Sequence, residues 1–207
     1  MKILLTGSAG QLGRELKRSL APLGELIACD RRQLDLADPD ALRNALRNLA
    51  PTVIVNAAAY TAVDKAETET GLAEAINASA PGLLAEEAKR LGARLIHYST
   101  DYVFDGTKAS AYREDDATTP LSAYGRSKRQ GELAIAASGA RYLVLRTSWV
   151  YGLHGANFMK TMLRLGRERD ELRVVGDQVG APTWTRHLAD ATALILAGHS
   201  TAEGLYH

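Results

Sequence analysis

Three glycines near the amino terminus constrain the fold of this chain more than any other feature. Gly7, Gly10 and Gly13 fall between a short apolar run at 3–5 and a segment at 14–20 whose leucines recur four residues apart, which is a helical period. Glycines so placed serve a tight turn, close approach of the backbone to a pyrophosphate, and close packing of helix on strand. Unpaired N–H groups at the helix N-terminus favour phosphate charge. This order predicts a dinucleotide site rather than a purely structural turn.

The rest of the chain continues the alternation of strand and helix. Further strands are predicted at 26–29, 53–55, 94–98, 142–146 and 172–175. Helices are predicted at 39–49, 70–91, 124–138, 157–165 and 188–197, with a kink or restart at Pro81. Residues 204–207 resemble the opening of another strand. The pattern predicts an α/β fold with a doubly wound parallel sheet of the Rossmann type and right-handed crossovers.

Composition narrows the possible partners and the compartment. The 207 residues suffice for one well-buried domain, and the 25 basic and 24 acidic residues nearly cancel. This balance favours neither a nucleic acid nor an anionic membrane as a partner. The single Cys29 excludes an intrachain disulfide and fits a reducing compartment. Because Met1 leads directly into the first apolar run without a signal-peptide pattern or a bilayer-spanning segment, we expect a cytoplasmic protein.

The end of the second predicted strand carries conflicting signals about the cofactor. Asp30 is placed to accept hydrogen bonds from the adenosine ribose, which favours NAD. Arg31 and Arg32 follow at once and are able to pair with a 2′-phosphate, which favours NADP, unless they are simply solvated. We therefore predict loose discrimination between NADH and NADPH.

A second polar cluster lies further along the chain. Thr100 and Asp101 end a predicted strand, at the edge where open α/β sheets bind ligands. Tyr124 and Lys128 are four residues apart and so share one face of a predicted helix. A free phenol has a pKa of about 10. A cation at ~4 Å contributes roughly 4 kcal/mol at an effective dielectric near 20, enough to lower that pKa by about three. The pair therefore predicts a proton donor that works near neutral pH.

The sequence alone favours a structural role for His97 and Asn77 and leaves the role of Trp149 open. His97 is interpreted as a satisfied strand residue rather than a base, and Asn77 as an ordinary polar helix residue rather than one that holds a neighbouring strand. Trp149 follows a predicted strand, where an indole is either core or a wall for a flat ligand.

Several motifs together resemble the extended short-chain dehydrogenase/reductases, and within them the branch that reduces dTDP-4-dehydrorhamnose. The matching stretches are 7–13, 56–67, 99–106, 124–128, 146–152, 157–158 and 177–183. The resemblance implies that NADPH or NADH delivers hydride to the 4-keto carbon of dTDP-4-dehydro-β-L-rhamnose. It further implies one NAD(P)-binding domain over 1–207, of which 150–207 includes the beginning of a substrate lobe.

The resemblance also implies roles for individual residues. Tyr124 would protonate the alkoxide, Lys128 would lower the pKa of Tyr124 and hold the nicotinamide ribose, and Thr100 would orient the carbonyl. Asp101 and Trp149 match sugar-contacting positions. The remaining matches are cofactor contacts: Gly7, Gly10, Gln11 and Leu12 for the pyrophosphate, Asp30 and Arg31 for the ribose, Asp35 and Leu36 for the adenine, and Ala59, Tyr60 and Thr61 for the nicotinamide half.

Two departures from this family affect what is expected. Family members continue beyond the length of this chain into a lobe that closes over the nucleotide, so we expect a shortened form that keeps cofactor binding. Some members dimerise through Mg²⁺ held by carboxylates. Glu15 matches one such ligand, but Arg186 stands where a second acid would be. We therefore expect no metal site, and interpret Glu15 as a solvated helix residue.

Two other functions share this scaffold. A nucleotide-sugar dehydratase needs a glutamate after the Thr-Asp pair, but Tyr102 follows Thr100 and Asp101 here. A non-catalytic NAD(P)-binding regulatory subunit, like that of methionine adenosyltransferase, is disfavoured by the motif at 146–152, yet the missing lobe keeps it open.

Overall fold

One parallel sheet organises the molecule. The computed structural model describes residues 1–198 and 201–207. Its main sheet has the strand order β2-β1-β3-β4-β5-β8, with every neighbouring pair parallel. The strands are β1 (Lys2–Thr6), β2 (Glu25–Cys29), β3 (Val53–Asn56), β4 (Arg94–Thr100), β5 (Arg141–Thr147) and β8 (Gly204–Tyr206). The predicted doubly wound Rossmann-type sheet is confirmed.

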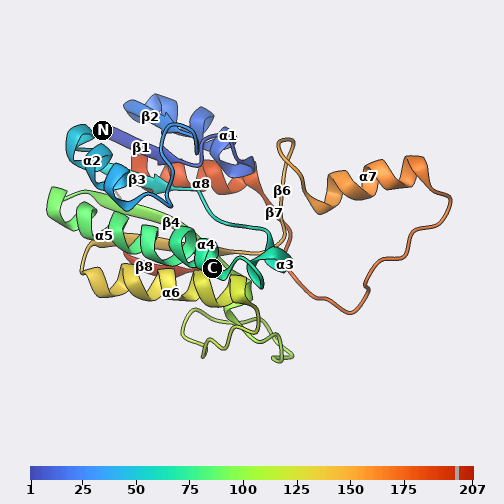
Figure 1. The fold of residues 1–207 in the computed structure, drawn as a ribbon. Coiled ribbons are helices and arrows are strands. Elements are labelled where there is room, and N and C mark those ends of the chain that lie inside the picture. The colour runs from blue at the N-terminus through green and yellow to red at the C-terminus, as the bar shows by residue number, and fades with distance from the viewer. Residues whose placement is uncertain (199–200) are drawn as a thin grey trace.

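Helices cover both faces of this sheet (Figure 1). Helices α1 (Gln11–Leu20) and α8 (Thr185–Ala197) pack together on one face. Helices α2 (Pro39–Leu49), α5 (Ala80–Leu91) and α6 (Ala123–Ser138) cover the other. Alternation along each strand supplies both cores: Ile3 and Leu5 pack with α1 and α8, whereas Leu4 packs with α2 and α5. All three side chains are fully buried.

The order of the strands determines where a ligand can bind. The chain moves from β1 outward to β2 and then crosses back to β3 on the other side of β1. Crevices form at the carboxyl ends of strands at such a reversal. The loops after β1, β2, β3 and β4 therefore meet at one edge of the sheet.

The segment expected as one long helix over 70–91 is helical throughout, but a π-helical turn lies within it. It consists of α4 (Thr70–Glu74), one π-helical turn at Ala75–Ser79, and α5, which has Pro81 in its first turn. Pro81 lacks an N–H, and the π-helical turn directly before it changes the hydrogen-bond pattern there. The backbone stays helical across this junction, so the interruption expected at Pro81 is a π-helical turn and not a restart of the helix. A short α3 (Val63–Ala66) precedes this segment.

The region after β5 departs most from the alternation. Helix α7 (Phe158–Glu168) has no buried residue and projects from the body of the molecule (Figure 1). Strands β6 (Val150–Tyr151) and β7 (Thr183–Trp184) form a separate two-stranded sheet. The strand predicted at 172–175 is wrong: these residues have no regular structure, because β-propensity needs a neighbouring strand. The strand expected near 204–207 is confirmed as β8.

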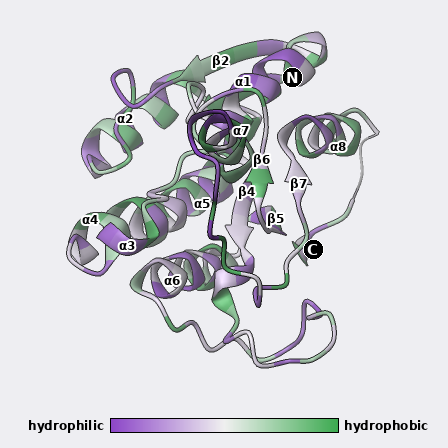
Figure 2. Ribbon diagram, turned by 90° about the vertical axis from the view of Figure 1, so that its right-hand side faces the viewer, coloured by the Kyte–Doolittle hydropathy of each residue, from purple (hydrophilic) through white to green (hydrophobic). Residues whose placement is uncertain are grey.

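Figure 2 colours the chain by hydropathy, both in the main body and in the projecting region after β5. Helix α8 buries Ala189 and Leu196 in the core under the sheet, whereas α7 exposes apolar side chains to solvent, including Phe158 and Leu163 at 65% and 59% exposure. Within the described residues, none of the helices has the length and apolar character required to cross a bilayer.

Candidate active site

The glycine loop after β1 forms a cradle of backbone. Gly7 has φ +69°, and a Cβ there would lie 2.6 Å from the backbone N of Ala58. A Cβ on Gly13 would lie 2.1 Å from the carbonyl O of Gly7. Both positions therefore exclude any side chain, and the loop after β1 lies directly against the loop after β3.

The N-terminus of α1 is free to receive an anion. Its N-cap is Gly10; no side chain in the described part of the chain caps it, and its first turn holds no acidic residue. The first N–H groups of a helix need acceptors, and phosphate oxygens supply them. The loop and the helix end thus fit the pyrophosphate of a dinucleotide, with Gln11 and Leu12 in the first turn.

The residues expected around the adenosine lie at the end of β2, beside this loop. The Ser8 N–H donates to the Cys29 carbonyl at 3.1 Å. One oxygen of Asp30 accepts from the backbone N–H of Arg32 at 2.9 Å, which shapes the turn. The guanidinium of Arg31 lies 3.4 Å from Asp35, an exposed pair worth little by itself. Leu36 is buried in the core beneath the turn that follows β2.

Asn77 fixes the loop after β3, so its interpretation as an ordinary polar residue is wrong. Its Oδ1 accepts from the Tyr60 N–H at 2.9 Å, and its Nδ2 donates to the Tyr60 carbonyl at 3.0 Å and to Ser127 Oγ at 3.1 Å. Asn77 is buried in the π-helical turn, a distortion common at functional sites. It therefore sets the course of Ala59, Tyr60 and Thr61.

Thr100 and Tyr124 meet at the carboxyl end of β4. Ser122 caps α6 by accepting from the Gly125 N–H at 3.0 Å. A Cβ on Gly125 would lie 2.2 Å from the Tyr102 carbonyl, so the helix start lies against the turn after β4. This approach brings the phenol of Tyr124 beside Thr100, whose hydroxyl donates to Asp101 at 3.1 Å. The Tyr102 ring packs edge-on against the Tyr124 ring at 5.5 Å between centroids.

Lys128 lies behind this pair, fully buried. Its Nζ donates to the Tyr98 carbonyl at 2.6 Å and lies 3.1 Å from Nε2 of His97. Burial lowers the pKa of Lys128 to about 8, with the nearby carboxylate of Glu132 opposing the shift. His97 is a buried residue of β4 with both ring nitrogens in hydrogen bonds, as the sequence interpretation held.

The expected effect of Lys128 on Tyr124 is not found in this arrangement. Burial raises the pKa of Tyr124 to about 12; the neighbouring Thr100 hydroxyl opposes this rise, while Asp101 and Tyr102 add to it. The amine of Lys128 is engaged by β4, so its charge does not act on the phenol. Desolvation of the phenol, which raises the pKa of Tyr124, therefore outweighs the stabilisation of the phenolate by Lys128 that the helical spacing predicts.

The positions matched to sugar contacts lie beside Thr100. Asp101 accepts from Thr100 Oγ1 at 3.1 Å and from Ser148 Oγ at 2.6 Å, so its carboxylate links the ends of β4 and β5. Trp149 has φ +45°, an uncommon value for a residue with a side chain and one found at functional sites. Its indole is 48% exposed and packs against Gly180, which excludes the core interpretation.

Asn157 joins the glycine loop to the projecting region, a link that sequence reasoning missed. Its Nδ2 donates to Gln11 Oε1 at 2.9 Å and to the Gly152 carbonyl at 2.8 Å, while its Oδ1 caps α7. The signal available in the sequence was an Asn just before an amphipathic helix.

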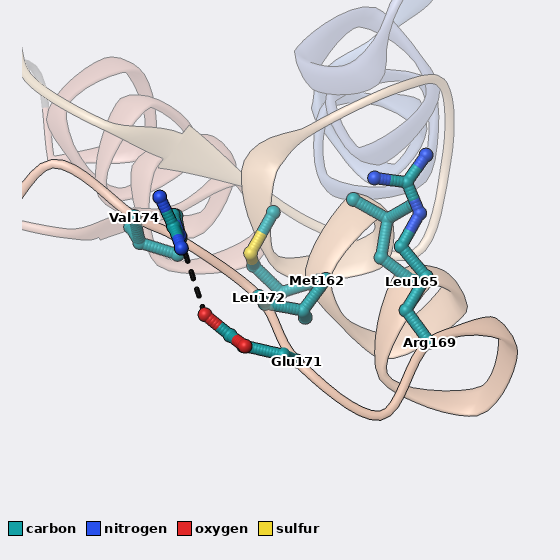
Figure 3. Close-up of a pocket in the computed structure, with 7 residues that line it drawn as sticks. Met162, Leu165, Arg169, Glu171, Leu172 and Val174 are labelled. Atoms are coloured by element: carbon teal, nitrogen blue, oxygen red, sulfur yellow. Dashed lines mark hydrogen bonds and ion pairs between the residues drawn. The ribbon is translucent and has the colours of Figure 1, made fainter.

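A pocket lies beside α7, away from all these groups. Figure 3 shows Met162, Leu165 and Leu172 gathered there, with Glu171 paired to Arg173. None of the residues lining this pocket belongs to the predicted site.

Glu15 is buried rather than solvated, contrary to expectation. It pairs with Arg18 at 3.5 Å and lies 3.9 Å from Nε2 of His154. Within residues 1–198 and 201–207, no three His, Cys, Asp or Glu side chains come together as a metal site would require.

Comparison with known proteins places this architecture among sugar-nucleotide reductases. Residues 1–207 match the family described as RmlD substrate binding domain. A dTDP-4-dehydrorhamnose reductase of Burkholderia thailandensis is 50% identical across all of this chain, which covers 72% of that protein. A solved dTDP-4-dehydrorhamnose reductase of Clostridium acetobutylicum is 43% identical with a TM-score of 0.95, covering all of this chain and 73% of its own. The Bacillus anthracis enzyme, solved in complex with NADP, is 38% identical with a TM-score of 0.94 over all of this chain and 74% of its own.

Proposed function

This chain belongs to the RmlD substrate binding domain family, and on that premise we propose that it reduces the 4-keto group of dTDP-4-dehydro-β-L-rhamnose to give dTDP-L-rhamnose. The observation that carries the proposal is the pair of Thr100 and Tyr124, side by side at the carboxyl end of β4, with the Tyr124 ring packed edge-on against Tyr102. This pair lies at the same edge of the sheet as the glycine loop, so a ketone there would have a proton donor on one side and a dinucleotide on the other.

The cofactor, NADPH or NADH, supplies the hydride when bound. The uncapped N-terminus of α1 and the glycine loop hold its pyrophosphate. Asp30 accepts from a ribose hydroxyl, and Arg31 is available for a 2′-phosphate. Because these two groups favour different cofactors, both nicotinamides are expected to bind.

The chain's own residues handle the proton. Tyr124 donates its phenolic proton to the sugar oxygen that becomes the new hydroxyl. Thr100 fixes the direction of that phenol and of the sugar carbonyl. Lys128, once it turns toward the phenol, stabilises the phenolate that remains. Asp101 and Trp149 border the sugar.

The proposed function also implies how the chain is divided into domains. Residues 1–207 form one NAD(P)-binding domain, and 150–207 includes the beginning of the substrate lobe. The small β6–β7 sheet and the projecting α7 support this, because they stand outside the main sheet. The proposed partner is a small nucleotide sugar, with no nucleic acid or membrane.

Reduction of the keto sugar tests the proposal directly. Purified protein is mixed with NADPH and dTDP-4-dehydrorhamnose, and oxidation of NADPH is followed together with formation of dTDP-rhamnose. A parallel mixture with a UDP-linked 4-keto sugar tests the nucleotide preference. Tight NADPH binding without sugar reduction would contradict the proposal and support a non-catalytic binding protein on this scaffold.

A further inference from the structure

A row of buried polar side chains crosses three strands and ends at Lys128. Thr6, Asn56 and His97 are register partners on β1, β3 and β4. Thr6 Oγ1 donates to Asn56 Oδ1 at 2.6 Å, Asn56 Nδ2 lies 3.0 Å from His97 Nδ1, and His97 Nε2 lies 3.1 Å from Lys128 Nζ. Every member is at most 2% exposed, so water does not substitute for any of these contacts.

A contact with the backbone of Ala58 fixes which side-chain atom of Asn56 is the oxygen and which is the nitrogen. Its Oδ1 also accepts from the Ala58 backbone N–H at 3.2 Å. A backbone N–H only donates, so the amide oxygen must face Ala58 and the amide nitrogen must face His97. The Asn56 nitrogen donates, and Nδ1 of His97 therefore has to accept.

This assignment determines where the His97 proton lies. A neutral imidazole has one donor and one acceptor nitrogen, so an accepting Nδ1 puts the proton on Nε2. Burial lowers the pKa of His97 well below its usual value, so the ring is neutral. The donor at Nε2 points at Lys128, and an ammonium has no lone pair with which to accept it.

We propose that His97 is a positioning residue that, held as the Nε2–H tautomer by Asn56, binds Lys128 as an uncharged amine. Lys128 then becomes an ammonium only by leaving His97. The charge that the proposed reaction requires beside Tyr124 is thereby tied to the movement of Lys128 out of its buried position. The inference rests on the proposed role of Lys128, but its test does not depend on turnover.

Two titratable groups act on Lys128 from the elements packed around it. His97 faces it from β4, and Glu132 lies one turn further along α6. Glu132 is itself paired with Arg146 of β5 at 2.8 Å and with Arg129 at 2.9 Å, which limits its effect. Tyr98, also on β4, offers only its carbonyl, since its hydroxyl bonds Thr192.

The tautomer can be measured without any variant. Protein labelled with ¹⁵N in its histidine rings is studied by NMR from pH 7 to pH 9, with no nucleotide added. The His97 signals are recognised as those that do not titrate, and His97→Gln removes them. We expect a protonated Nε2 and an unprotonated Nδ1 throughout. A protonated Nδ1, or an imidazolium, would overturn the proposal.

A single isosteric change reverses the expected pattern. The carboxylate of Asn56→Asp still accepts from Thr6 and Ala58 but also accepts from His97, so the proton should move to Nδ1. Nε2 then accepts from an ammonium, and the titration midpoint of Lys128, followed by ¹³Cε shifts, should rise by roughly one pH unit or more. The exposed Asn48→Asp should change neither value.

The outcomes separate three explanations. A rise in the Lys128 midpoint with an unchanged His97 tautomer would reduce Asn56→Asp to a simple charge effect and overturn the proposal. Wild-type protein that shows the expected tautomer but reduces no sugar would contradict the proposed function and leave this inference standing. In active protein, the alkaline limb of the kcat profile should move upward with Asn56→Asp.

Discussion

Asn77 binds both backbone polar groups of Tyr60, its amide oxygen accepting from the N–H at 2.9 Å and its amide nitrogen donating to the carbonyl at 3.0 Å. The two residues are 17 positions apart, and the pair of bonds acts as a clamp between the π-helical turn and the loop after β3. This loop lies against the glycine cradle, so the clamp supports the cofactor side of the site.

Replacing Asn77 should therefore impair both stability and binding. Asn77→Ala leaves the N–H and the carbonyl of Tyr60 without partners, at a cost of about 1 kcal/mol for each of these partly buried groups. We expect lower stability in urea and weaker NADPH binding by fluorescence titration. Asn48→Ala, on the exposed face of α2, is the matched control and should change neither. Unchanged binding in Asn77→Ala would show that the clamp is not needed.

Alanine substitutions at two glycines, one in the glycine cradle and one outside it, should affect NADPH binding differently. Gly13→Ala places a Cβ 2.1 Å from the Gly7 carbonyl, so the loop or the helix has to move. Gly71→Ala meets no atom within 4 Å. NADPH affinity should fall at least about tenfold in the first variant, equivalent to 1.4 kcal/mol, and stay constant in the second. Equal affinities would place the pyrophosphate elsewhere.

A buried ion pair joins α6 to β5. Glu132 and Arg146 share two hydrogen bonds at 2.8 and 2.9 Å, with side chains only 2% and 3% exposed. Burial raises the pKa of Glu132, but hydrogen bonds from Arg146 and other groups outweigh it, so the pKa lies below its ordinary 4.5. Glu132→Gln should cost about 3 kcal/mol at neutral pH, because Arg146 loses its counter-charge.

The pH dependence of that cost has a defined sign. A depressed carboxyl pKa contributes stability that is present above the ordinary value of 4.5 and lost as pH falls through the folded value. The difference between wild type and Glu132→Gln in urea unfolding should therefore shrink below about pH 4.5. Glu74→Gln, at an exposed position of α4, should show no such pattern. A gap that widens on acidification would contradict the assignment.

The sequence predicted the site better at the level of elements than at the level of side-chain contacts. The glycine spacing, the alternation of strands and helices, and the position of Thr100 and Tyr124 follow from local patterns that the fold preserves. The roles of Asn56 and Asn77 do not, because each bonds groups across tens of residues and no local pattern encodes such partners. The residues at 172–175 have the composition of a strand but no strand to pair with.

The pKa of Tyr124 shows why spacing alone is insufficient. Residues four apart on a helix share a face, yet the Lys128 side chain is long enough to turn into β4. Burial, which no sequence pattern gave for this phenol, then sets the direction of its pKa.

Lys128 should make stability rise with pH over an unusual range. Its pKa is lowered from 10.5 to about 8, so between these values the unfolded chain binds a proton that the folded chain does not. Stability relative to Lys128→Met should therefore increase by about 3 kcal/mol between neutral pH and about pH 11. Urea unfolding at several pH values measures this, and the exposed Lys17→Met corrects for general alkaline effects. A gap independent of pH would show that Lys128 titrates normally.

Proton transfer from Tyr124 is tested most directly by comparing Tyr124→Phe with Tyr102→Phe in NADPH oxidation by dTDP-4-dehydrorhamnose. The two rings are in edge-to-face contact, and each substitution removes one hydroxyl while keeping the ring. We expect turnover to fall at least ~100-fold in Tyr124→Phe, with NADPH binding retained, and to change little in Tyr102→Phe. Equal turnover by wild type and Tyr124→Phe would contradict the account.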